Sequence, residues 1–415
     1  MKSLFSALSP NIEKDDLLLT KKVLKRSVDE DINHVQILTG LFNEYLGGKS
    51  FAFQSGRMAF WAILRSFSWP AGSEIIVPGF TCAAAINPII WSELKPVFVD
   101  INESLNIDLK KIESKISGKT KGILVQHTFG LPVDMIKIKE LAEKYNLKII
   151  EDCAHSLGSN FRGKLLGSWG DAAFFSLGRD KIISSVFGGL AFTNNSLLAD
   201  RLANLMQEAS YPSNKWIKQQ LRHPLLTAKW IMPYYNKKEL GRKILLFSQK
   251  IGLLSKAMTR EEKMGKMRSD ELIQMPQSLA ILAINQFSKL NYHQQHRIKI
   301  ANFYREKLKN LPILLPREDT ERTYLKFNII FSDKKTADDM LKYFRSQNIY
   351  LYDGWKDSPI VPSDVDLSAM QYQKGICSVA EDLSGKLVNL PTHINISMED
   401  ASRIVETIKS FLNTL

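Results

Sequence analysis

Short apolar runs alternate with amphipathic stretches through the first half of the chain. The runs at 74–78, 96–100, 121–126, 147–150 and 172–175 have the length and the residue types of buried strands. The stretches at 83–94 and 136–145 predict helices that connect them. Strands that alternate with helices predict a mainly parallel sheet with right-handed crossovers, which is an α/β fold.

The pattern changes toward the C-terminus. A helix is predicted within 275–290, a strand at 324–330, and helices at 337–347 and 398–412, which together indicate a smaller α+β domain. A chain of 415 residues is long enough for two domains. We therefore expect an N-terminal arm and helix over 1–50, a large domain over 51–210, an insert over 211–268 and a small domain over 269–415. Asp29 or Asp31 is the expected cap of the first helix.

The composition is that of a protein that folds in water. Apolar residues make up 44% of the chain, no apolar run is long enough to span a bilayer, and the N-terminus turns polar too early for a secretory signal. Cys82, Cys153 and Cys377 lie far apart without a C-x-x-C spacing, which argues against a disulfide framework and against zinc. The C-x-H of Cys153 and His155 is too weak a signal to predict a metal. We expect a soluble protein of the cytoplasm.

The positive charge is concentrated in one segment. The chain has a net charge of +13, and residues 215–268 carry fourteen basic and three acidic residues, a net charge of +11. No nucleic-acid motif accompanies this excess, so nucleic acid is not an expected partner. The stretches 216–232 and 242–258 are amphipathic, with tryptophan and leucine opposite lysine and arginine. Such helices either lie at an anionic membrane surface, here the inner leaflet, or pack on the sheet or on a partner subunit.

Residues 151–193 carry the chemistry. A carboxylate pair, Glu151 and Asp152, follows one predicted strand, and Lys181 lies beyond the next one. In open α/β sheets the ligand-binding groups gather at the carboxyl ends of the strands, so the acid and the lysine can face one crevice. Pyridoxal phosphate requires this pair: a lysine for its Schiff base and an acid against its pyridinium nitrogen.

Several motifs in this order resemble one known family. They read EDCAH at 151–155, GSWGDAAFFS at 167–176, SGRMAF at 55–60, PAGSEIIVPGFT at 70–81, HTFGLPVDM at 127–135 and GKLVNLPTH at 385–393. The sequence is similar to the DegT/DnrJ/StrS sugar aminotransferases over roughly residues 43–411, except in the basic insert. The resemblance implies fold type I, the fold of pyridoxal-phosphate-dependent transferases.

The resemblance also assigns the reacting groups. Lys181 corresponds to the lysine that binds the cofactor, Asp152 to the acid at the ring nitrogen, and His155 to the residue near the phenolic oxygen. Ser176 corresponds to the phosphate-binding serine. Relatives that remove a sugar hydroxyl with the same cofactor carry histidine at the lysine position, so Lys181 favours transamination.

Two further parts of the cofactor site are implied, with open alternatives. The turn before the helix that starts at Gly56 corresponds to the phosphate seat, with the backbone amides of Gly56, Arg57 and Met58 as donors. The Arg57 side chain either adds a charged contact to the phosphate or points to solvent. The aromatic that stacks on the ring in the family falls by alignment on Cys82, so Phe80, another ring or the Cys82 sulfur takes its place.

One family feature is missing. An Asn-Tyr-Arg segment that reaches into the neighbouring subunit aligns with Leu272, Ile273 and Gln274, and Gln277 is a candidate replacement. We expect an aminotransferase, at least dimeric, that moves an amino group, with glutamate as the donor, to a keto sugar that is nucleotide-linked or membrane-delivered. Its product would serve surface polysaccharide or glycan-precursor synthesis. The alternatives are a pyridoxal-phosphate-dependent dehydratase or lyase, and a non-catalytic membrane-associated regulator on the same fold.

Overall fold

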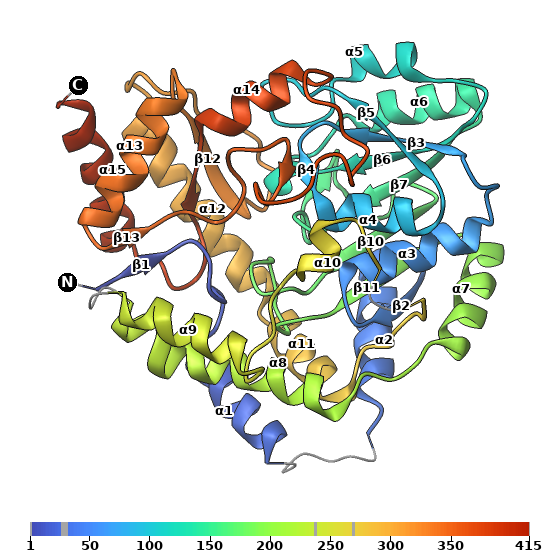
Figure 1. The fold of residues 1–415 in the computed structure, drawn as a ribbon, viewed down its shortest axis with the longest axis horizontal. Coiled ribbons are helices and arrows are strands. Elements are labelled where there is room, and N and C mark those ends of the chain that lie inside the picture. The colour runs from blue at the N-terminus through green and yellow to red at the C-terminus, as the bar shows by residue number, and fades with distance from the viewer. Residues whose placement is uncertain (1, 26–31, 236–238, 268–269, 415) are drawn as a thin grey trace.

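The computed structural model of the protein describes residues 2–25, 32–235, 239–267 and 270–414. Its centre is a seven-stranded sheet with the order β2-β11-β10-β7-β6-β3-β5 (Figure 1). All neighbours from β10 to β5 are parallel, and β11 is antiparallel to both of its neighbours. The predicted mainly parallel sheet is confirmed. The strands are β2 (Lys49–Phe53), β3 (Glu74–Pro78), β5 (Lys95–Val99), β6 (Thr120–Gln126), β7 (Lys148–Asp152), β10 (Ala172–Ser176) and β11 (Gly189–Thr193).

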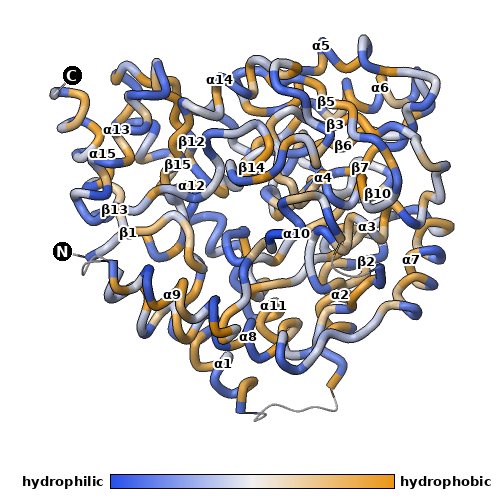
Figure 2. Tube along the Cα trace, viewed as in Figure 1, coloured by the Kyte–Doolittle hydropathy of each residue, from blue (hydrophilic) through white to orange (hydrophobic). Residues whose placement is uncertain are grey.

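Helices cover both faces of this sheet. One core includes α3 (Gly56–Phe67), α4 (Ala83–Trp91) and α7 (Ser196–Glu208), and a second includes α2 (His34–Leu46), α6 (Met135–Tyr145) and α11 (Gln277–Phe287). Because both faces are covered, the central strands read as continuous apolar runs, which Figure 2 shows along β3, β6 and β7. Helix α4 ends before the predicted residue 94, because Glu93 takes a left-handed conformation with φ +56°.

The C-terminal part has a core of its own. Helices α12 (Leu290–Leu308), α13 (Lys334–Ser346) and α15 (Met398–Leu412) pack with the antiparallel pair β12 (Lys326–Ile330) and β15 (Leu387–Pro391). This is the predicted small α+β domain. Strands β13 (Ile349–Tyr350) and β14 (Ile360–Val361) and helix α14 (Ser378–Lys386) complete it. Strand β14 pairs with β4 (Thr81–Cys82) of the large domain, which brings the two parts together beside the sheet.

The N-terminal arm crosses to the C-terminal domain. Strand β1 (Leu4–Phe5) pairs with β13, and α1 (Lys14–Leu24) then packs against α8 (Asn214–Leu226) and α11. Asn33 caps α2, its side chain accepting from the Gln36 amide at 3.0 Å. The predicted caps Asp29 and Asp31 lie outside the described residues. The domain boundaries at 50, 210 and 268 remain a proposal. Helix α11 follows residue 268 in the sequence, but it packs on α2, which precedes residue 50.

The basic insert is largely helical. Of the two predicted amphipathic stretches, 216–232 is helical throughout, whereas 242–258 is helical only as far as Lys250 and then continues in turns and coil. Its elements are α8 (Asn214–Leu226), a π-helical turn η3 (Thr227–Ile231), η4 (Met232–Tyr234), α9 (Leu240–Lys250) and α10 (Arg260–Lys263). None of the helices in the described part of the chain is both long and apolar enough to cross a membrane. The remaining short elements are α5 (Leu109–Ile112), η1 (Glu113–Lys115), η2 (Thr128–Gly130), β8 (Asn160–Phe161) and β9 (Lys164–Leu165).

Candidate active site

A cavity of about 310 Å³ lies at the carboxyl ends of β7 and β10. Its wall brings together seven of the nine residues that the sequence predicts for the cofactor site. Met58 and Phe80 are outside the lining. The seven are Gly56, Arg57, Cys82, Asp152, His155, Ser176 and Lys181.

Lys181 lies in the loop between β10 and β11. The Asn11 side chain of the N-terminal arm donates to the backbone carbonyls of Lys181 and Ile182, and these two hydrogen bonds fix the position of the loop. Burial lowers the pKa of the Lys181 ammonium, while the negative charges of Asp152 and Asp180 act against this shift. A lysine with a lowered pKa is a better nucleophile, as Schiff-base formation requires.

Asp152 ends β7 and faces the cavity. Burial raises the pKa of its carboxyl, and the hydrogen bond from the Ala154 amide and the charge of Lys181 oppose that rise. Such a carboxyl is most stable as an anion when a cation is placed against it. The site therefore favours a protonated, positively charged ring nitrogen as the partner of Asp152.

Glu151 is adjacent in sequence but points to the opposite face of the sheet, as successive strand residues do. Its buried carboxylate accepts from the amides of Gly167, Trp169 and Gly170 at 2.7–2.8 Å and contacts His127 Nε2 at 3.2 Å. Glu151 therefore holds the 167–170 loop in place and takes no part in the cavity.

His155 is buried between two aromatic rings. Its imidazole stacks on Phe129 with centroids 5.5 Å apart and meets the Trp355 ring edge-on at 4.6 Å. Burial lowers the pKa of His155 well below its usual value, so the ring is neutral at neutral pH. Its Nδ1 accepts from the Phe129 amide at 3.4 Å, which assigns the proton to Nε2. His155 can therefore donate one hydrogen bond.

The start of α3 forms an anion seat. Ser55 caps the helix by accepting from the Met58 amide at 3.3 Å, which leaves the amides of Gly56 and Arg57 directed out of the first turn. A Cβ built at Gly189 would lie 2.2 Å from the Gly56 nitrogen, so only glycine lets β11 approach the helix this closely. Ser176 lies beside Gly56, and its Oγ accepts from the Gly178 amide at 3.3 Å, which leaves the hydroxyl hydrogen to donate.

The Arg57 side chain is bound to the basic insert. Its guanidinium forms an ion pair with Glu262 and donates to the Ala257 carbonyl at 2.7 Å. Both carboxylate and guanidinium are largely shielded from water, with 11% of each side chain exposed. The side chain does not point to solvent, as one of the two predicted orientations has it; it faces a neighbouring segment of the same chain at the cavity wall, and a contact to phosphate stays a prediction.

The two candidates for the ring-stacking position lie in different environments. Phe80 is fully buried and meets Trp355 edge-on at 5.5 Å, beneath the cavity wall. Cys82 lines the cavity and caps α4, its sulfur accepting from the Ala84 amide at 3.4 Å. Burial raises the pKa of the Cys82 thiol, so it faces the cavity as a neutral, polarisable group.

Comparisons with known proteins agree with this geometry. The family model of the DegT/DnrJ/EryC1/StrS aminotransferases matches residues 10–409. The chain belongs to this family. It is 31% identical to dTDP-3-amino-3,6-dideoxy-alpha-D-galactopyranose transaminase of Aneurinibacillus thermoaerophilus over 89% of this chain and 88% of that protein. It is 26% identical to GDP-perosamine synthase of Escherichia coli O157:H7, over 91% and 86% of the two chains.

The fold is also that of solved structures. PseC of Helicobacter pylori, an aminotransferase involved in the biosynthesis of pseudoaminic acid, superposes with a TM-score of 0.77 over the whole of both chains at 19% identity. Fold type I is therefore confirmed. The protein is an aminotransferase of a pyridoxal-phosphate-dependent family.

The cavity of this aminotransferase fits pyridoxal phosphate. The cofactor needs an amine, an acid for the ring nitrogen, a donor near the phenolic oxygen and an anion seat, and the cavity offers each of these. Asp180 Oδ1 and Arg179 Nε also line or approach it as buried atoms without a hydrogen-bond partner in the described part of the chain. Unpartnered polar atoms in a cavity wall are expected where a polar ligand binds.

The C-terminal domain contributes residues that the sequence did not reveal. Lys326, Asp353 and Trp355 line the same cavity, and Lys326 Nζ lies 3.5 Å from Asp353 Oδ2. Asp353 is buried, which raises the pKa of its carboxyl, and the Lys326 charge opposes that rise. No motif marks these residues. Gln126, another wall residue, did carry a signal, because it ends the predicted strand at 121–126.

The segment that replaces Asn-Tyr-Arg is bound within the aminotransferase chain itself. The Ile273 carbonyl accepts from the Gln54 amide at 2.9 Å, and the Gln274 side chain donates to the carbonyls of Met206 and Ala209. Gln277, the candidate replacement, accepts from the Val35 amide at 2.9 Å at the start of α2. None of these residues lines the cavity formed by the described residues.

Two clusters of metal-ligand side chains lie elsewhere, and their charges are already compensated. His127, Glu151 and Cys153 form one cluster, in which Glu151 accepts three backbone hydrogen bonds. In the other, Lys289 lies 2.9–3.1 Å from all three acids, which are Glu13, Asp15 and Asp16. We assign no metal role to either cluster.

Proposed function

We propose that this aminotransferase moves an amino group from glutamate to a nucleotide-linked keto sugar. The observation that carries the proposal is one cavity that holds Lys181, Asp152 and His155 in a chain related over most of its length to transaminases of dTDP- and GDP-linked sugars. The product class would serve surface polysaccharide or glycan-precursor synthesis in the cytoplasm.

Each wall residue has a distinct role in this proposal. Lys181 Nζ would bind the cofactor and, as a free amine, would accept the proton that leaves the donor's α-carbon. Asp152 keeps the ring nitrogen protonated, and His155 Nε2 donates to the phenolic oxygen. The Gly56 and Arg57 amides and the Ser176 hydroxyl hold the phosphate, and Cys82 packs on the ring. When bound, pyridoxal phosphate supplies the electron sink for this chemistry.

The decisive experiment follows the two half-reactions by visible absorption. The cofactor bound to Lys181 should give a visible band that glutamate bleaches, and a keto sugar linked to dTDP or GDP should restore it. A band that no amino donor changes would favour a dehydratase or lyase function. The presence of Lys181 argues against that function. The absence of any band would favour a non-catalytic regulator.

A dimer is the proposed assembly, because the family resemblance implies active sites built from two subunits. Light scattering of the purified protein should give about twice the mass of the 47.2 kDa chain. A monomeric mass together with full turnover would contradict it.

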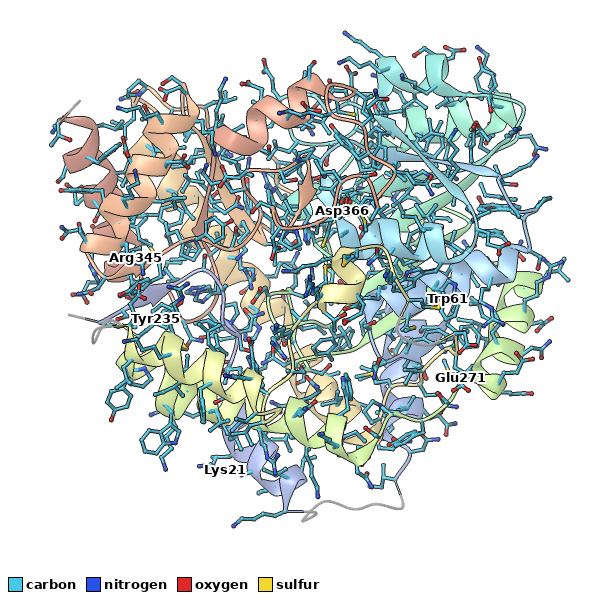
Figure 3. All side chains as sticks on the ribbon, viewed as in Figure 1. Lys21, Trp61, Tyr235, Glu271, Arg345 and Asp366 are labelled. Atoms are coloured by element: carbon cyan, nitrogen blue, oxygen red, sulfur yellow. The ribbon has the colours of Figure 1, made fainter. Side chains whose placement is uncertain are left out.

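We further propose that the insert makes a peripheral contact with an anionic membrane. One side of α8 packs on α1 and α11, but Leu246 and Phe247 on α9 and Ile251 at its C-cap are 53%, 62% and 57% exposed. Lys243 and Lys250 are exposed on the same helix. Figure 3 labels Arg345, which forms an ion pair with Glu239, the residue that precedes α9. Exposed apolar residues flanked by lysine suit an anionic interface.

Vesicle flotation tests this contact. The protein should float with phosphatidylglycerol vesicles at low salt and not with phosphatidylcholine vesicles, and Phe247→Glu should abolish flotation. If Phe247→Glu instead halves the mass in solution, the helix is an interface between copies, and the membrane proposal fails. The absence of flotation of the unaltered chain also rejects it.

A further inference from the structure

The end of the basic insert forms part of the cavity wall. Residues 255–265, here called the strap, reach the cavity, and Ala257 and Met258 line it together with Lys181. In Figure 1 the strap, with its short helix α10, lies in front of the sheet between the large and the small domain. The sequence placed no chemistry in this segment, so its position at the site is a finding of the structure.

The strap is held on its large-domain side by three side chains. Arg57 binds Glu262 and the Ala257 carbonyl, as described above. Asn87 Nδ2 donates to the Glu262 carbonyl at 2.8 Å, and Trp91 Nε1 donates to the Gly265 carbonyl at 3.1 Å. Asn87 is fully buried, so its contact is shielded from competing water.

The other contacts fix both ends of the strap. Arg179 Nη2 donates to the carbonyl and hydroxyl of Ser255 at 3.1 and 2.9 Å. At the far end, the Asp366 amide donates to the Lys263 carbonyl at 2.9 Å, and the labelled Asp366 lies beside α10 in Figure 3. Thr259 and Glu262 close α10 with a capping box. The strap is therefore an ordered wall with a defined conformation.

The two arginines that hold the strap belong to the cofactor loops. Arg57 is in the first turn of α3, the anion seat, and Arg179 lies two residues before Lys181. The elements that position the cofactor thus also position Ala257 and Met258. Ala257 and Met258 therefore share one cavity with Lys181, at which the substrate reacts.

Size decides which substrate meets the strap. A cavity of about 310 Å³ is at the lower limit for a drug-sized ligand, and the cofactor occupies part of it. An amino acid needs less of this space than a sugar linked to a nucleotide, so the sugar reaches more of the cavity wall. We infer that Met258 is a specificity-determining residue that contacts the acceptor sugar and leaves the amino donor untouched. This inference rests on the proposed function.

The side chain of Met258 suits this role. It is partly buried and packs beside the first core, and a thioether is apolar, flexible and without a hydrogen-bond donor. It would pack against the face of a sugar ring that presents C–H groups, or against a methyl group.

Separate half-reactions test the inference. Met258→Trp should leave the bleaching by glutamate within about twofold of the unaltered rate. It should slow the return of the band with dTDP- and GDP-linked keto hexoses by about tenfold or more, because misfit of a bulky group in an apolar pocket costs at least that much. Met264→Trp is the matched control, since Met264 lies in the same strap, is 40% exposed and does not line the cavity. Equal slowing of both half-reactions, or of neither, would overturn the inference.

A second measurement does not depend on turnover. In Met258→Cys, alkylation of residue 258 by iodoacetamide is followed by mass spectrometry, with Met264→Cys as the control. The nucleotide-linked keto hexose should slow alkylation at 258 about tenfold and glutamate should leave it unchanged, because only a bound ligand shields the thiol. If the unaltered enzyme uses the sugar but residue 258 is not protected, the inference fails alone. If the unaltered enzyme uses no such sugar, the proposed function fails first.

Discussion

The cavity has two walls that are built in different ways. The wall with Asp152, Ser176 and Lys181 follows two adjacent parallel strands, and the backbone ladder of the sheet sets its geometry. The opposite wall is the strap, which lacks such a ladder and is held by side chains such as Arg57 and Arg179. A wall set by a sheet keeps the reacting groups in place, whereas a wall held by a few side chains can change with little effect on the sheet. The sheet wall therefore suits the reaction chemistry, and the strap suits the choice of substrate.

The largest effect should follow from Lys181→Ala. Removal of the amine prevents attachment of the cofactor and removes the proton carrier, so turnover should fall by about a thousandfold or more. The visible absorption band should disappear, which a spectrum of the protein with added pyridoxal phosphate measures. Lys119→Ala, at an exposed position, is the control. Full activity of the Lys181→Ala enzyme would show that the lysine of the sheet wall takes no part in the mechanism.

Asp152→Asn should have the next largest effect. The amide oxygen still accepts from the Ala154 amide, 2.9 Å away, but the charge that keeps the ring nitrogen protonated is lost. We expect turnover to fall about a hundredfold, as when one preorganised electrostatic group is removed. Steady-state kinetics at saturating cofactor measures it. Asp134→Asn, at the N-cap of α6, is the matched control, because asparagine caps a helix as well as aspartate. Equal losses in both variants would contradict the assignment.

Glu151→Gln tests how firmly the sheet wall is built. Its carboxylate accepts three backbone amides in a fully buried position, and glutamine has one acceptor oxygen and adds two hydrogens. The free energy of unfolding should fall by about 3 kcal/mol, measured by urea denaturation. Glu262→Gln in the strap should cost only about 1 kcal/mol, because glutamine still accepts from Arg57. A larger loss from the strap variant would reverse the contrast between the walls.

The sheet wall was predictable because short segments of the sequence determine it. Apolar runs fix the strands, adjacent parallel strands end at the same edge, and residues after those ends therefore meet, as Asp152 and Lys181 do. The motif around residues 55–58 likewise predicted the start of α3 within its own sequence.

The strap was not predictable, because its contacts join distant residues. Arg57 and Glu262 are 205 positions apart, and neither flanking sequence indicates the other. The basic excess of the insert suggested a surface role, while its final residues are the ones that reach the cavity. Lys326 and Asp353 were missed for the same reason: the pairing of β14 with β4 brings their domain to the sheet edge, and no periodicity encodes that contact.

The smallest expected effect is a pH dependence of stability, which one buried histidine at the cavity and one in the basic insert produce. Burial lowers the pKa of His155 in the large domain and of His223 in α8 well below the usual value. Each ring is neutral in the folded chain but protonates in the unfolded chain below about pH 6.5. The unfolded state then binds more protons, so stability is full above that pH and is lost as pH falls, by up to about 1.4 kcal/mol per pH unit and histidine. Urea denaturation at pH 7.5, 6.5 and 5.5 measures the slope. His223→Gln should reduce the slope by one histidine's share, and an unchanged slope would mean that α8 opens and admits the proton before the rest of the chain unfolds.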